Sequence, residues 1–222
     1  MEALRIEPAS AAAWEDVRAV FGTRGEAARC LCQRMRLPHR AWHAMTLSER
    51  EARLRAQTGA GEPGAAATSG LVAWLGDDPV GWCAVEPRPV FAKLFQSQAT
   101  VPWAGRSEDR ADAGVWAVAC FVTRAGFRRR GVMRALTAAT VGHARARGAR
   151  AVEGYPMAAS VGGDVPWGEM SVGAESAFAA AGFRVVSRPV PRRVVMRVDL
   201  GNLGGRRAPG APHPAGSDNG GA

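Results

Sequence analysis

The sequence contains almost no lysine and almost no tyrosine. Lys93 is the only lysine among 29 Lys and Arg residues, and Tyr155 is the only tyrosine. Arginine therefore carries nearly all of the formal net charge of +9. An arginine-rich surface favours anionic ligands, nucleic acids among them. Nucleic-acid binding is not needed to explain this charge, because a phosphate-binding turn and a solvated helix face account for the seven arginines between positions 125 and 150.

Cysteine is also scarce, and its spacing does not suit a metal site. Cys30 and Cys32 lack the two-residue spacer that is common in zinc ligand pairs. Cys83 and Cys120 lie in apolar segments that read as buried strands. We therefore expect no metal site and reduced thiols.

Long hydrophobic runs are absent. No segment approaches the ~18 uninterrupted apolar residues of a membrane span. The N-terminus has an acidic residue at position 2 and no apolar stretch typical of a secretory signal. We therefore expect a cytoplasmic protein without membrane contact.

The chain of 222 residues, 47% of them hydrophobic, is long enough for one domain with a full core. Strand and helix patterns alternate through residues 1–200, which we interpret as a single α/β domain. Residues 201–222 are rich in Gly, Pro and Ala and have no apolar anchor. We expect them to form a disordered tail.

The most informative stretch is 115–155, which reads as strand, basic turn, helix and strand. Val115–Val122 is almost wholly apolar, as expected for a strand covered on both faces. Apolar residues recur at helical spacing through 132–143, and Gly148 predicts the end of this helix. Residues 150–155 then predict a second strand.

The turn between this strand and helix carries the chemistry. A helix N-terminus presents unpaired backbone N–H groups and a partial positive charge. Gly131 lets an anionic ligand approach the backbone closely. Arg128, Arg129 and Arg130 add guanidinium groups whose geometry suits phosphate. The turn therefore predicts a diphosphate-binding site.

Two motifs resemble those of a known family. Arg128-x-x-Gly131-x-Met133, between an apolar strand and a helix, resembles the acyl-CoA pyrophosphate loop of the GNAT acyltransferase superfamily. That loop reads Gln or Arg, x, x, Gly, x, Gly or Ala, so Met133 departs from it. Gly182-Phe183, after a helical run, resembles a late element of the same superfamily. The resemblance implies a single GNAT-like domain with a central mixed, mostly antiparallel sheet of about seven strands flanked by helices.

The resemblance also implies a function. It is that of an acyl-CoA-dependent N-acyltransferase, with acetyl-CoA the commonest donor, acting on the amine of a small molecule by direct attack. The pantetheine arm would pair with backbone groups freed at Phe121 and Val122. The residues implied to hold the diphosphate are Arg128, Arg129, Arg130, Gly131, Val132 and Met133. The alternatives are a protein or peptide N-acetyltransferase and a non-catalytic acyl-CoA-binding regulatory module, and a homodimer is one option.

The catalytic groups depart from the family pattern. The usual proton donor is a tyrosine four residues before the Gly of the Gly-Phe element, and Phe178 stands there. Trp116 occupies the position where some members carry a carboxylate. Glu153 and Tyr155 are two apart in the second strand and so share a face. We predict Glu153 as base or amine anchor and Tyr155 as acid; the alternative is a structural pair, with the Glu bound to arginine.

Patterns elsewhere complete the expected fold. By the family resemblance, residues 30–42 would help line the acceptor site. The further elements expected are a strand at Leu4–Pro8, a helix at Ala11–Phe21 capped by Ser10, a helix from Glu49 to Gln57 with a Ser48–Glu51 capping box, a hairpin of 71–75 and 80–85, a long Gly-rich loop at Pro156–Gly173, a helix at 173–181 and strands at 185–186 and 194–198.

Overall fold

A computed structural model describes residues 3–62, 64–65, 69–95, 103, 105–158 and 171–201. Their centre is a seven-stranded sheet in the order β1-β2-β3-β4-β5-β7-β6. Only the β4–β5 pair is parallel, and the other neighbours are antiparallel. This confirms the predicted mixed, mostly antiparallel sheet. The strands are β1 (Leu4–Pro8), β2 (Leu71–Leu75), β3 (Asp78–Pro87), β4 (Val115–Thr123), β5 (Ala151–Gly154), β6 (Arg184–Val190) and β7 (Arg193–Asp199).

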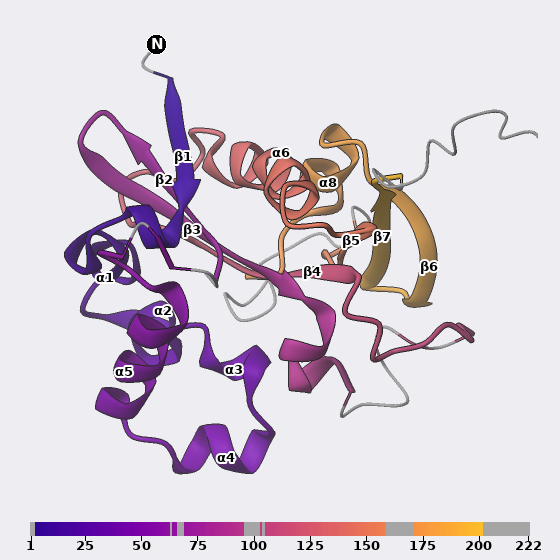
Figure 1. The fold of residues 1–222 in the computed structure, drawn as a ribbon, viewed down its shortest axis with the longest axis horizontal. Coiled ribbons are helices and arrows are strands. Elements are labelled where there is room, and N and C mark those ends of the chain that lie inside the picture. The colour runs from indigo at the N-terminus through magenta and orange to yellow at the C-terminus, as the bar shows by residue number, and fades with distance from the viewer. Residues whose placement is uncertain are drawn as a thin grey trace, which may run out of the picture.

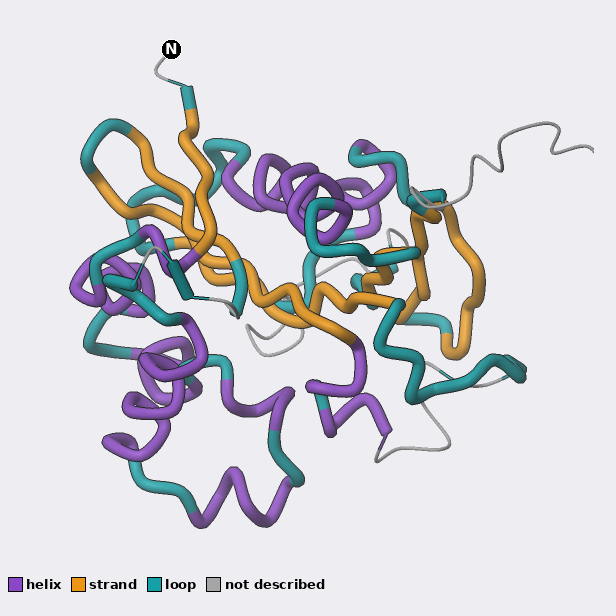
Figure 2. Tube along the Cα trace, viewed as in Figure 1, coloured by secondary structure: helices purple, strands orange, loops and turns teal. Residues whose placement is uncertain are grey.

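Helices cover both faces of this sheet (Figure 1, Figure 2). One face carries α6 (Val132–Arg145) and α8 (Glu175–Ala180), with one hydrophobic cluster beneath them. A second cluster lies on the other face. The elements on that side are α1 (Trp14–Phe21), α2 (Gly25–Cys30), α3 (Gln33–Arg36), α4 (His39–Ala44) and α5 (Leu47–Thr58), with the short 3-10 turns η1 (Ala9–Ala11), η2 (Arg88–Val90) and η3 (Ala92–Phe95). Within the described ranges, no helix is long and apolar enough to cross a membrane.

The predicted unit at 115–155 is present as a strand, helix and strand. β4 is buried along its length up to Val122, as its apolar sequence requires. Helix α6 begins at the predicted Val132 and packs closely on β3, because Gly81 has no side chain there. A Cβ on Gly81 would lie 2.4 Å from Cγ1 of Val132. The basic turn therefore lies between the end of β4 and the start of a helix that is packed tightly against the sheet.

Strands β4 and β5 pair only over part of their lengths. The parallel register runs from Val115 opposite Ala151 to Val118 opposite Gly154. Beyond that point β4 continues to Thr123, whereas the chain after Gly154 leaves the strand. The two strands therefore part in the middle of the sheet, which frees one side of the β4 backbone.

Several predicted details differ in the structure. The capping box that starts α5 is formed by Thr46 and Glu49, whose backbone N–H and side chain bond reciprocally, so the predicted Ser48–Glu51 box is wrong. Both pairs fit the same spacing pattern, and the sequence does not separate them. Ser10 is buried in η1 and does not cap α1. The predicted tail at 202–222 and most of the loop 156–173 lie outside the described residues.

Candidate active site

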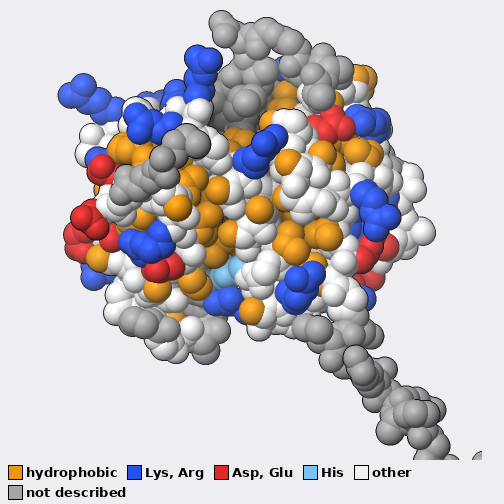
Figure 3. Space-filling view, turned by 90° about the horizontal axis from the view of Figure 1, so that it is seen from above, with side chains coloured by type: hydrophobic (Ala, Val, Ile, Leu, Met, Phe, Trp, Pro, Cys, Tyr) orange, Lys and Arg blue, Asp and Glu red, His pale blue; other side chains and the backbone are white. Residues whose placement is uncertain are grey.

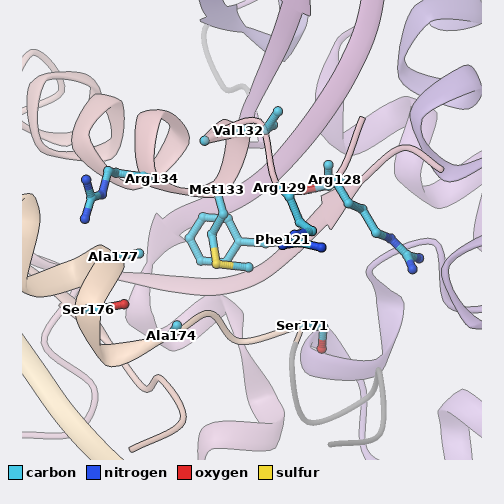
Figure 4. Close-up of a pocket in the computed structure, with 12 residues that line it drawn as sticks. Phe121, Arg128, Arg129, Val132, Met133, Arg134, Ser171, Ala174, Ser176 and Ala177 are labelled. Atoms are coloured by element: carbon cyan, nitrogen blue, oxygen red, sulfur yellow. The ribbon is translucent and has the colours of Figure 1, made fainter. Parts of the chain in front are cut away.

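A cavity of about 540 Å³ opens where β4 and β5 part (Figure 4). Its walls come from the unpaired end of β4, the basic turn, the first turn of α6 and the segment that leads into α8. The lining residues are Phe121, Thr123, Arg128, Arg129, Gly131, Val132, Met133, Arg134, Ser171, Ala174, Ser176 and Ala177. Residues from two distant parts of the chain thus enclose one pocket.

The N-terminus of α6 faces this pocket without a capping side chain. Gly131 is its N-cap, with φ of 78°, a left-handed conformation that glycine adopts without strain. Arg129 has a φ of 64° and is also left-handed. Within the described residues, no side chain caps the first N–H groups of α6, and its first turn contains no acidic residue. These N–H groups are therefore available to an anion.

The side chains around the pocket are also positively charged. Arg128, Arg129 and Arg134 line it, and all three are exposed. The side chains of Arg128 and Arg134 point in opposite directions from the pocket floor (Figure 4). Viewed from above, Lys and Arg side chains are spread over the surface, whereas Asp and Glu gather toward two sides of it (Figure 3). The pocket therefore suits an anionic ligand with several charged oxygens.

Most of the residues predicted to hold a cofactor line this pocket. The two that do not are Val122, whose side chain packs in the hydrophobic cluster on the opposite face, and Arg130, whose guanidinium lies 5.4 Å from the ring centroid of Phe127. Sequence reasoning missed Thr123 and Arg134. Thr123 is two residues after Phe121 and so shares its face of the strand, and Arg134 lies in the first turn of the helix that Gly131 begins. Sequence reasoning also missed Ser171, Ala174, Ser176 and Ala177, which reach the pocket only because α8 packs beside α6.

The inner end of the pocket lies at the freed backbone of β4. The N–H of Phe121 points away from β3 and donates to the carbonyl oxygen of Ser171 at 2.6 Å. Beside it, the ring of Phe178 packs edge-on against that of Phe121, with centroids 6.0 Å apart. Phe178 is fully buried and fills the space that Gly154 and Gly173 leave by having no side chain. A phenylalanine ring thus stands at the gap where the family pattern has a tyrosine.

Glu153 and Tyr155 lie on the other face of the sheet and are not among the pocket-lining residues. The Glu153 carboxylate is fully buried and pairs with Arg88 at 3.2 Å, Arg197 at 3.1 Å and Arg106. The Tyr155 hydroxyl donates to Oε2 of Glu153 at 3.2 Å. Both side chains do share one face, as predicted, and the arginine pairing is the structural alternative that the sequence left open.

The environment of Tyr155 keeps its phenol neutral. Burial raises the pKa of Tyr155 well above its usual value, and the neighbouring Glu153 charge raises it further. The side chain therefore holds its proton at any physiological pH, and Glu153 fixes the direction of that proton. The raised pKa also makes this phenol a weaker proton donor than a free tyrosine, so burial does not favour the predicted role of acid.

The sequence as a whole has one family match. A model of the acetyltransferase (GNAT) family matches residues 35–156, more than half of the chain, including the basic turn and the parting strands. The chain belongs to the GNAT acetyltransferase family. This confirms the resemblance seen in the turn, and it makes the protein a member of a family of N-acetyltransferases. No curated protein is detectably similar to it in sequence.

The solved structures that match this chain are distant from it in sequence. The putative acetyltransferase yncA from Salmonella typhimurium, solved with its cofactor acetyl-CoA, is 14% identical; the match covers 93% of this chain and 99% of that one, with a TM-score of 0.49. An N-acetyltransferase from Staphylococcus aureus Mu50 is 14% identical, with coverages of 90% and 99% and a TM-score of 0.47. A Bacillus acetyltransferase in complex with CoA is 14% identical, with coverages of 59% and 76% and a TM-score of 0.36.

Proposed function

We propose that this GNAT family member transfers the acetyl group of acetyl-CoA to the amine of a small molecule. The observation that carries the proposal is the uncapped, glycine-started N-terminus of α6, which opens onto a pocket beside the freed backbone of β4. The N–H groups of α6 would bind the diphosphate, and Arg128, Arg129 and Arg134 would supply opposite charge. When bound, acetyl-CoA supplies the acetyl thioester that the amine attacks.

The β4 backbone would orient the extended arm of the cofactor. The Phe121 N–H already bonds a carbonyl oxygen, that of Ser171, so it is a donor directed into the space between β4 and the segment before α8. We infer that an amide oxygen of the pantetheine arm takes this donor in place of Ser171. The exchange keeps the Phe121 N–H satisfied in both states, and the released carbonyl oxygen of Ser171 must then bond to water or another donor.

Tyr155 is the side chain that we propose as the acid. Phe178 has no proton to give, and Tyr155 is the only phenol in the chain. Glu153 would then act by orienting the Tyr155 hydroxyl, because its carboxylate is already neutralised by three guanidinium groups. The proton from Tyr155 would go to the departing thiolate, and the amine proton would leave to solvent. The non-catalytic alternative is favoured by Phe178, by Trp116 at the position of the family's carboxylate, and by the absence of Glu153 and Tyr155 from the pocket lining.

Substitution of Gly131 tests the cofactor assignment. Any side chain at a φ of 78° adds strain of ~1–2 kcal/mol, which asparagine tolerates best. Gly131→Asp adds like charge about 5 Å from a diphosphate, which at an effective dielectric of 20–80 costs about 1–3 kcal/mol for each phosphate charge. Counting a single phosphate charge, Gly131→Asp should therefore bind acetyl-CoA at least about 5-fold more weakly than the matched control Gly131→Asn, and the second charge adds to this loss.

The measurement is titration calorimetry with acetyl-CoA on both folded variants and the wild type. Equal affinity of the Asp and Asn variants would show that no diphosphate lies at this turn. Release of free thiol from acetyl-CoA across a panel of small amines then separates the enzyme from the non-catalytic binding module, which would bind but not turn over.

A further inference from the structure

Two histidines face each other on the surface helix α4. His39 and His43 are one helical turn apart, and their Nε2 atoms lie 3.0 Å from each other. The ring centroids are 4.3 Å apart, and both residues are exposed. Helix α4 buries none of its residues, so nothing on the protein side covers the two ring nitrogens. The two Nε2 atoms share one hydrogen bond at a solvent-accessible point, and a metal ion would take the place of the shared proton.

We propose that His39 and His43 form a binding site for a divalent transition-metal ion of the copper and nickel class. Metal–imidazole bonds are about 2.0–2.1 Å long, so two donors 3.0 Å apart enclose an angle of roughly 90–97° at the metal. That is the cis angle of square-planar and octahedral coordination, which Cu²⁺ and Ni²⁺ prefer. Tetrahedral coordination, typical of zinc, would need the donors about 3.4 Å apart.

The residues around His39 and His43 determine the affinity of the site for a metal ion. Among the described residues, no group of three or more His, Cys, Asp and Glu side chains is placed to hold a metal, so water would complete the coordination. The nearby guanidinium of Arg50 lies over the ring of Trp42 and donates to the carbonyl oxygens of Trp42 and Arg29. Its charge lowers the affinity for a cation but does not block the imidazoles, so the site is a two-ligand chelate.

A bound ion would act on α4 itself. The helix has no capping side chain and no buried residue, so its folding gains little from the core. Two ligands on successive turns tie those turns together, and metal binding is then coupled to helix formation. Trp42 lies beside the site, with its ring 4.5 Å from that of His43, and provides a local fluorescence reporter.

The test is a titration of untagged protein with Cu²⁺, and in parallel Ni²⁺, at pH 7.5 in a weakly coordinating buffer. The expected result is one ion per chain with quenching of tryptophan fluorescence. His39→Gln and His43→Gln should each lower the affinity by at least about tenfold, because the second imidazole binds as an intramolecular ligand. The matched control is His213→Gln, which removes a histidine outside the described residues and should leave the affinity unchanged.

A second variant locates the ion. Trp42→Phe should keep the affinity and lose a share of the quenching, since the quenched ring lies next to His43. The proposal is overturned if the wild type binds no Cu²⁺, if both His→Gln variants bind as tightly as the wild type, or if only His213→Gln loses binding.

Discussion

Replacing Glu153 by glutamine should destabilise the protein strongly, although the change removes no atom from the core. Glu153 and Arg88 are both fully buried, and their side chains pair at 3.2 Å. Arg106 and Arg197 also pair with the same carboxylate. Glu153→Gln keeps the shape and removes the one charge that balances these guanidinium groups at the centre of the cluster.

The size of the destabilisation depends on which hydrogen-bond partners the arginines retain after Glu153→Gln. Removing one partner of a buried ion pair costs about 3–5 kcal/mol, because the other charge stays buried. Arg88 retains the carbonyl oxygens of Asp109 and Arg110 and a longer contact to Glu108 at 3.4 Å, which places the cost near the lower end, about 3 kcal/mol. For a domain of this size that corresponds to a fall in Tm of about 6–12 °C.

Urea denaturation followed by circular dichroism measures the effect, with Glu108→Gln as the matched control. The Glu108 side chain is 35% exposed, so its contacts to Arg88, Arg106 and Arg197 should contribute about 1 kcal/mol or less. A Glu153→Gln variant as stable as Glu108→Gln would refute the buried-cluster reasoning. Loss of rate with unchanged stability would return Glu153 to the predicted role of base or amine anchor.

Two further predictions concern protonation. Burial, with Arg147 nearby, lowers the pKa of His143 to about 4. Between pH 6.5 and pH 4 the unfolded chain therefore binds more protons than the folded chain, and the free energy of unfolding falls by about 3 kcal/mol as the pH is lowered. Urea midpoints across that range should show this slope, and His143→Leu should lose it. Tyr155→Phe should lower kcat by ~10²–10⁴-fold with little change in KM, and turnover at the wild-type rate would rule out Tyr155 as the acid.

The fold was predictable where one pattern spans a whole element. The apolar run of β4 and the helical spacing of α6 are local, and both elements begin where the sequence indicates. The segment 25–44 was not predictable in this way, because its short helices α2 to α4 bury few residues and show no sustained apolar period. Leu31 and Cys32 there adopt left-handed conformations, which no propensity rule assigns to them.

The pocket was predictable only in its contiguous part. A helix N-terminus, its glycine and its arginines follow one another in sequence, so the motif alone indicates the site. Ser171 and Ser176 reach the pocket through the packing of α8, which depends on the rest of the fold. The partners of Glu153 come from positions 44 to 65 residues away in the chain, and composition shows the excess of arginine without showing which arginines meet the carboxylate.

Six of the arginines form two groups with opposite consequences. Arg88, Arg106 and Arg197 form ion pairs with Glu153 and Glu108, which hold Arg88 and residues 106–110 against β5 and β7. In the part of the chain that the structure describes, the pocket arginines 128, 129 and 134 form no ion pair with a carboxylate. Their charge is unbalanced beside N–H groups of α6 that also lack a partner, so only an added anion can neutralise both. The charge of this turn therefore fits the proposed diphosphate site and does not by itself indicate affinity for nucleic acid.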